Sequence, residues 1–153
     1  MARRIGMLSC WNVTQECDCA SGLCLRDFRK RQGEFSRYPK DEKLELIGMI
    51  NCAGCPTLRA PEKILHKVRA LVEMNVDAIH LTFCMVSLCP FVRMYVDVIE
   101  EAYPMVSVVY GTHDPRVSSE TFQEEVKGLF CAPRKGITDV ISARPKGKTS
   151  ILR

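Results

Sequence analysis

Short apolar runs alternate with amphipathic segments along most of this chain, and this alternation constrains its fold more than any other feature. The apolar runs, which are typical of buried β-strands, cover residues 5–9, 44–50, 76–83 and 105–110. Strands that alternate with helices form parallel βαβ units with right-handed crossovers. We therefore predict an α/β fold, a three-layer sandwich of the flavodoxin-like type, whose mainly parallel four-stranded sheet has the order 2-1-3-4.

The segments between the strands carry the periodicity of helices. Apolar residues recur at helical spacing from Ile64 to Val72, with Pro61 suited to the first turn and Asn75 to the end. Further helices are expected over residues 25–31, from Pro90 to Tyr103, and over residues 118–130. A chain of 153 residues is long enough for one domain with a substantial core. We assign that domain to residues 1–130 and a basic C-terminal tail to residues 131–153.

The positive charge of the chain is concentrated in this tail. Six Lys and Arg residues stand against one Asp from Cys131 to Arg153, a net charge of +5, which leaves −1 for residues 1–130 of a chain whose net charge is +4. A solvated end is the simplest interpretation. Because basic segments bind phosphate without sequence preference, contact with nucleic acid or another acidic partner is the alternative. Ile137 to Ile141 is a candidate edge strand.

Targeting signals and membrane segments are not evident in the sequence. No apolar run approaches the roughly 18 residues of a membrane span. The apolar stretch Ile5 to Leu8 is too short for the core of a signal peptide. We expect a cytoplasmic protein with no membrane partner, in which thiols stay reduced and clustered cysteines favour metal binding or redox chemistry over structural disulfides.

The chain contains nine cysteines, and most of them follow predicted strands. The carboxyl ends of parallel strands converge on one edge of a sheet, where ligands bind in open α/β folds. The residues expected to gather there as metal ligands are Cys10, Cys52, Cys55, Cys84, Cys89 and His113. A loop predicted after the first strand adds three auxiliary candidates on the same side, which are Cys17, Cys19 and Cys24. Cys131 lies outside this pattern and is expected to be an isolated thiol.

The segment Cys52-Ala-Gly-Cys55 is a CxxC motif with three common interpretations: half of a zinc site, a thiol–disulfide pair, or ligands of an iron–sulfur cluster. A tetrahedral zinc ion needs four ligands, whereas the sheet edge offers six. The surplus is compatible with an iron–sulfur cluster, or with one metal ion beside a separate thiol pair. Zinc is our first choice of cofactor and an iron–sulfur cluster is the second. The third interpretation is a redox protein that uses Cys52 and Cys55 as a thiol pair.

The other two histidines and the remaining motifs point to no reaction. His66 is expected on the surface of a helix, and His80 inside a strand as a core histidine with satisfied hydrogen bonds. No strand is followed by a Gly-rich phosphate loop. A cysteine nucleophile with His113 as its base is supported by position alone. The sequence therefore indicates a site without assigning an enzymatic activity.

Four spaced motifs resemble the CGGC-domain family, a group of small cysteine- and histidine-rich proteins described as metal-binding domains. The matching stretches are Ile50 to Pro56, Ala78 to Cys84, Cys89-Pro90 and Tyr110 to His113. The strand that ends at Cys10 and the loop of Cys17 and Cys24 also look like the opening segment of the family, so the resemblance covers about residues 4–113. Ala53 stands where the family name implies glycine, which is acceptable unless that residue needs a positive φ. The resemblance implies metal binding, and the metal usually named for the family is zinc.

Overall fold

A computed structural model describes residues 1–131 and residue 141. Its four strands are β1 (Arg3–Ser9), β2 (Leu44–Asn51), β3 (Ala78–Leu81) and β4 (Ser107–Tyr110). All neighbouring strands pair in parallel, in the order β2-β1-β3-β4. The predicted α/β class, parallel sheet and strand order are therefore confirmed. Most of the predicted basic tail, and nearly all of the candidate strand Ile137 to Ile141, lie outside the described residues.

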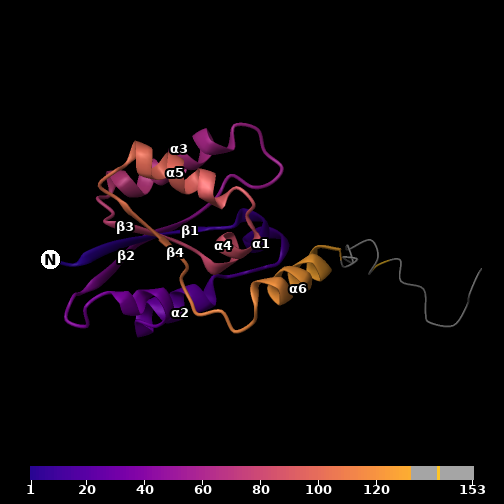
Figure 1. Cartoon of the computed structure of the whole chain (residues 1–153), viewed down its shortest axis with the longest axis horizontal. Helices are drawn as coiled ribbons and strands as arrows, with labels where there is room; N and C mark the ends of the chain where they lie inside the picture. The colour runs from indigo at the N-terminus through magenta and orange to yellow at the C-terminus, as the bar shows by residue number, and fades with distance from the viewer. Residues whose placement is uncertain (132–140, 142–153) are drawn as a thin grey trace, which may run out of the picture.

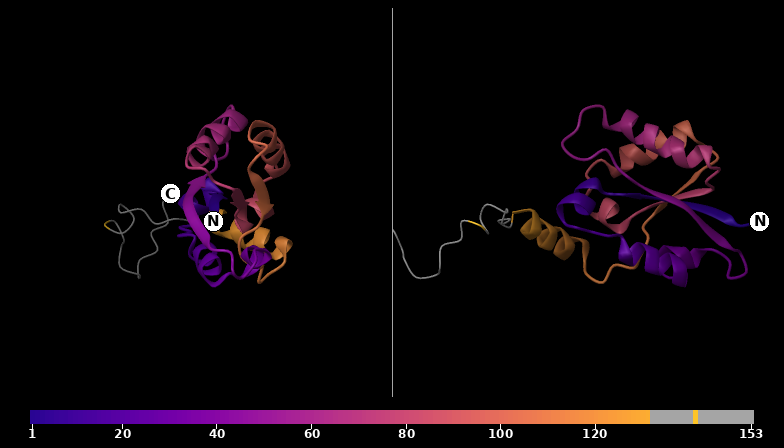
Figure 2. Two further views of the ribbon diagram at one scale, coloured as in Figure 1. Left: turned by 90° about the vertical axis from the view of Figure 1, so that its left-hand side faces the viewer. Right: turned by 180° about the vertical axis from the view of Figure 1, so that it is seen from behind.

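Helices cover both faces of the sheet, as a three-layer sandwich requires (Figure 1). The helices α3 (Ala60–Glu73) and α5 (Val92–Ala102) pack on one face, and α2 (Gly22–Lys30) lies on the other with the 3-10 helix Gly33–Arg37 (Figure 2). The apolar stripe predicted in α3 is buried through Ile64, Val68 and Leu71 against the sheet. Asn75 follows this helix with φ 54°, a conformation that asparagine tolerates at helix ends.

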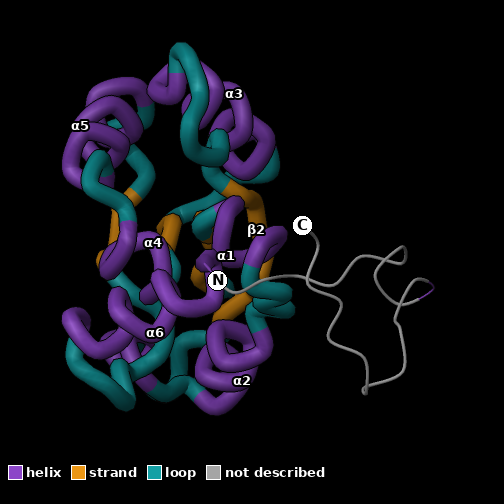
Figure 3. Tube along the Cα trace, turned by 90° about the vertical axis from the view of Figure 1, so that its right-hand side faces the viewer, coloured by secondary structure: helices purple, strands orange, loops and turns teal. Residues whose placement is uncertain are grey.

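Two short helices at the carboxyl edge of the sheet differ from the sequence prediction. Residues predicted as loop form α1 (Trp11–Glu16), and the third strand ends at Leu81 because Thr82 begins α4 (Phe83–Leu88). The last helix, α6 (Ser119–Cys131), packs over the same edge, where α1, α4 and α6 face the viewer in Figure 3. Cys84 therefore lies on a helix and not in a loop.

A β-bulge interrupts the pairing of the two strands that carry the first cysteines. Ile5 pairs with Leu46 but Gly6 pairs with Gly48, so β2 contains one extra residue at this point. From there the register runs without a break to Ser9 and Asn51. The residues that follow, Cys10 and Cys52, consequently leave the sheet side by side.

His80 of β3 is a buried polar residue that packs beside Phe35 and Tyr38. This side chain is fully buried; its Nδ1 lies 2.9 Å from the carbonyl oxygen of Gly111, and its Nε2 lies 2.8 Å from the hydroxyl of Tyr38. Its ring stacks on Phe35 at 4.4 Å. The prediction of a core histidine is confirmed, and His66 is exposed on α3 as expected.

In the part of the chain that the structure describes, no helix combines the length and the apolar character needed to cross a bilayer.

His80 should make the fold sensitive to mild acid. Burial lowers its pKa from 6.5 to about 4, while the hydrogen bond to Gly111 opposes this shift. In the unfolded chain His80 takes up a proton below pH 6.5, whereas in the folded chain it does so only near pH 4. The contribution of His80 to the free energy of unfolding is therefore complete above pH 6.5 and is lost as the pH falls from 6.5 to 4. We expect a loss of about 3 kcal/mol from this residue.

Urea unfolding measured from pH 7 to pH 4 checks this. In the wild type the free energy of unfolding should fall as the pH is lowered. His80→Gln should reduce this dependence on pH, whereas the exposed control His66→Gln should keep it. An unchanged slope in His80→Gln would contradict the prediction.

Candidate functional site

Cys10 and Cys52 form a directly hydrogen-bonded pair of thiols at the carboxyl ends of β1 and β2. The backbone N–H of Cys52 donates to the carbonyl oxygen of Ser9 at 2.8 Å, which extends the sheet pairing by one residue. The Cys10 thiol then donates to the sulfur of Cys52. Sheet register thus brings together two cysteines that are 42 positions apart in the sequence.

Several donors stabilise the thiolate of Cys52. The hydrogen bond from Cys10 is the largest cause that lowers the pKa of Cys52 to about 6, and burial opposes it. The backbone N–H groups of Trp11 and Gly54 contribute further, the former at 3.2 Å from the sulfur. Lys67 adds a positive charge and donates to the carbonyl oxygen of Cys52 at 3.0 Å. Because Cys10 is the donor, its own pKa is raised. The hydrogen bond therefore favours a pair made of one thiolate, on Cys52, beside one thiol, on Cys10.

The CxxC turn is held against α1. Asn12 and Cys55 exchange two hydrogen bonds: the side-chain amide of Asn12 donates to the Cys55 carbonyl at 3.1 Å, and the Cys55 N–H donates to the Asn12 side-chain oxygen at 3.2 Å. Gly54 has φ +82°, whereas Ala53 has no positive φ. The position that requires glycine therefore keeps it, and alanine at 53 is compatible with the turn.

Cys89 ends α4 and faces the same space as the CxxC turn. Burial is the main reason why the pKa of its thiol is raised, and the neighbouring Cys55 and Cys52 add to this. A cavity of about 370 Å³, hereafter the first cavity, is lined by Cys10, Cys52, Cys55 and Cys89. Tyr95 of α5 also lines it, and burial together with these thiols raises the pKa of the phenol to about 12.

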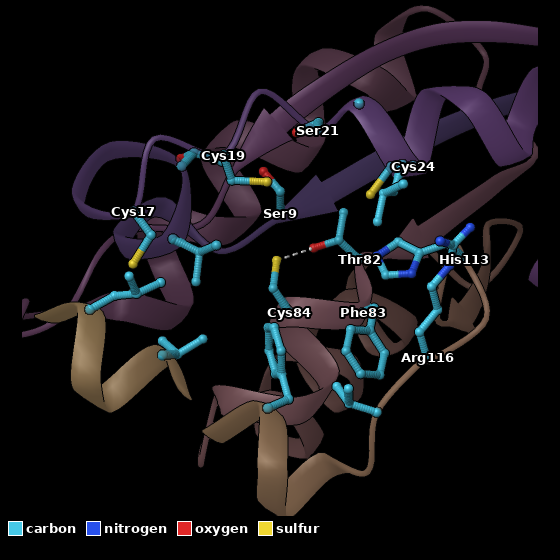
Figure 4. A pocket seen from close by; sticks show the side chains of 18 of the residues that line it. Ser9, Cys17, Cys19, Ser21, Cys24, Thr82, Phe83, Cys84, His113 and Arg116 are labelled. Carbon is cyan, nitrogen blue, oxygen red and sulfur yellow. Dashed lines mark hydrogen bonds between the residues drawn. The ribbon is translucent and has the colours of Figure 1, made fainter. Parts of the chain in front are cut away.

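The other predicted ligands line a second cavity of about 540 Å³, which adjoins the first at Val13 of α1 (Figure 4). Its lining includes Cys84 and His113 and the three auxiliary candidates Cys17, Cys19 and Cys24. The His113 ring lies 5.1 Å from that of Phe83, and its Nδ1 is 3.2 Å from the carbonyl oxygen of Asp114. Val13 of α1 and Val126 of α6 line both cavities and so stand between them.

The structure thus brings the predicted ligands to one edge but distributes them over two cavities. Cys84 links the two groups, because its sulfur accepts a hydrogen bond from the backbone N–H of Cys10 and its charge affects the Cys10 thiol. Sequence reasoning missed the pairing of Cys10 with Cys52, and also Asn12, Lys67 and Tyr95. No local motif marks these residues, since the strand register brings the two thiols together and three different helices, α1, α3 and α5, bring Asn12, Lys67 and Tyr95 to them.

The thiolate of Cys52 can be measured directly. In the reduced, metal-free protein we expect one thiol to ionise with a midpoint near pH 6, seen as thiolate absorbance in the ultraviolet. Cys10→Ala removes the main donor, so the midpoint should move upward. Cys52→Ser should abolish this first step, whereas Cys24→Ser, at a similarly buried position, should retain it. A first ionisation above pH 8 in the wild type would refute the assignment.

Comparison with known proteins agrees with the observed motifs. The sequence profile described as the CGGC domain matches residues 4–113. No curated protein and no solved structure shows significant similarity to the chain. The match includes β1 from its second residue, all of β2 to β4, and the eight cysteines from Cys10 to Cys89, and it ends before α6. The chain belongs to the CGGC-domain family, which suggests that it binds a metal.

Proposed function

We propose that this protein binds zinc through Cys10, Cys52, Cys55 and Cys89. The observation that carries the proposal is the first cavity, which gathers four thiols, one of them ionised near neutral pH. Four cysteine thiolates form a common tetrahedral zinc set. The donor chemistry of these residues therefore fits the metal that the family suggests.

The site has to close around the ion. Among residues 1–131 and at 141, no three His, Cys, Asp or Glu side chains are already arranged to hold a metal. Cys55 is exposed on a turn and Cys89 is half-buried at a helix end, so these two side chains are the ones expected to turn inward. Cys10 contributes by losing the proton it shares with Cys52, because a bound cation favours the thiolate form.

Cys84 and His113 stay outside this ligand set because they line the second cavity. An iron–sulfur cluster is the alternative occupant of the first cavity, since four cysteine thiolates also hold such clusters. The two occupants differ in colour and in iron and sulfide content. Nucleic-acid binding by the basic tail concerns residues 131–153 and draws no support from the described part of the chain.

Elemental analysis of anaerobically purified protein tests the proposal. We expect about one zinc per chain in the wild type, and a loss of most of it in Cys52→Ser and Cys89→Ser because each variant removes a ligand. Cys24→Ser is the control from the second cavity and should retain zinc. Brown protein with iron and sulfide that depends on the same two cysteines would favour the cluster. Full metal retention in Cys52→Ser and Cys89→Ser would refute a site in the first cavity.

A second candidate function is thiol–disulfide exchange, and the contact between Cys10 and Cys52 favours it. The Cys52 thiolate would attack a substrate disulfide, forming a mixed disulfide and releasing one substrate thiolate, which takes up a proton. Cys10, after losing its proton, would then attack the Cys52 sulfur and release the second substrate thiol. The substrate gains two electrons and the Cys10–Cys52 pair loses two. Cys10 is hydrogen-bonded to Cys52, whereas Cys55 is exposed on its turn.

Peptide mapping after oxidation of the metal-free protein with a small disulfide separates these pairings. We expect a Cys10–Cys52 disulfide that a dithiol reduces again. In Cys10→Ala, the mixed disulfide on Cys52 should persist because no neighbour resolves it. A Cys52–Cys55 bridge in the wild type would instead support the CxxC pair.

A further inference from the structure

The second cavity contains a cluster of thiols that the proposed zinc site does not use. Cys24 lies on α2, Cys84 on α4, and Cys19 in the segment that joins α1 to α2. All three line the cavity, and Figure 4 shows their side chains around the space between Ser9 and Thr82. The remaining wall is mostly apolar and includes Val13, Phe83, Phe122 and Leu129.

Each of these three thiols lies within electrostatic reach of the other two. Burial is the main cause that raises the pKa of Cys24 to about 11, and the thiols of Cys84 and Cys19 add to it. Burial likewise raises the pKa of Cys84, with a further contribution from Cys19. The three thiols thus line one cavity within range of one another's charge.

Two buried hydroxyl groups fix the inner pair of thiols. The sulfur of Cys24 lies 3.2 Å from the hydroxyl of Thr112, and that of Cys84 lies 3.0 Å from the hydroxyl of Thr82. Both threonines are almost completely buried. Cys19, by contrast, is exposed, and its segment begins and ends with residues of positive φ, Asp18 and Ser21. Two sulfur atoms are therefore held in place and the third is at the cavity surface.

We propose that Cys19, Cys24 and Cys84 form a second metal site, distinct from the first cavity, that binds a single Cu(I) ion. Thiolates are soft ligands that select Cu(I). Three donors complete a Cu(I) site without the fourth ligand that a tetrahedral zinc ion takes. The wall is mostly apolar and offers few partners for the water molecules that a harder cation would retain as ligands. The step involves no electron transfer, because Cu(I) replaces the thiol protons and these pass to solvent.

Binding draws Cys19 onto the inner pair. Within the described residues no three donors are already arranged around one point, so the site closes when the ion enters. Cys24 and Cys84 approach the ion from two different helices, α2 and α4. Cys19 then covers it from the solvent side. His113 stays at the cavity wall and is not needed as a ligand.

Competition with a coloured Cu(I) chelator tests the site on the full-length chain. The reduced protein, with its zinc retained, is titrated anaerobically with the Cu(I)–bicinchoninate complex. We expect the wild type to withdraw about one Cu(I) per chain without releasing zinc. Because loss of even an outer-shell partner weakens metal sites about 10- to 100-fold, Cys24→Ser and Cys84→Ser should weaken retention at least to that extent.

Two further variants keep the result interpretable. Cys19→Ser alters an exposed residue and should weaken Cu(I) retention while the circular dichroism of the fold stays unchanged. Cys89→Ser, in the first cavity, should retain Cu(I) although it loses zinc. Equal Cu(I) retention in the wild type, Cys24→Ser and Cys19→Ser would overturn the proposal. The proposal would also be overturned if Cu(I) released one zinc per chain and Cys52→Ser no longer retained Cu(I), because Cu(I) would then occupy the first cavity. If the purified chain carries no zinc, the zinc proposal fails, but the same variants still test whether Cys19, Cys24 and Cys84 bind Cu(I). The two proposals can therefore fail independently.

Discussion

The parallel pairing of β1 with β2 is the constraint on which the chemistry of this molecule depends. Cys10 and Cys52 are adjacent only because the register carries through Ser9 and Asn51 to the hydrogen bond between Cys52 and Ser9. That register in turn depends on the bulge near Gly6, where β2 has one residue more than β1. Without the extra residue, Asn51 would stand opposite Cys10. The thiol pair is therefore a property of the sheet and not of the CxxC turn.

Burial raises the pKa of a thiol and hydrogen-bond donors lower it, and a different one of these two effects dominates in each cavity. In the first cavity, donors outweigh burial at Cys52, so that a thiolate exists near neutral pH. In the second cavity burial dominates at Cys24 and Cys84, and the hydroxyl partners only reduce its effect. One sheet edge thus offers an ionised sulfur on one side of α1 and protonated sulfurs on the other. The two cavities are suited to different occupants even though their donor atoms are the same.

Much of the fold could be predicted from the sequence because its signals are local. Four apolar runs and the stripe of α3 identified the sheet and its covering helices, and the position of the cysteines after strands located the edge. The helices α1 and α4 escaped prediction because each has only six residues, too few to establish a period. The division of the ligands could not be foreseen, since it depends on how Val13 of α1 and Val126 of α6 come to lie between the two cavities. Such packing involves contacts between residues far apart in the chain.

The last helix gives the two cavities a common wall. Val126 of α6 lines both, yet this helix follows the segment that matches the family. It is attached through the Phe83–Phe122 ring contact and through a hydrogen bond from Gln123 to the carbonyl oxygen of Ser87. Both anchors are on α4, the helix that carries Cys84 and is followed directly by Cys89. A single displacement of α6 would therefore admit solvent to both sets of thiols at once, so the solvent exposure of the two cavities would change together.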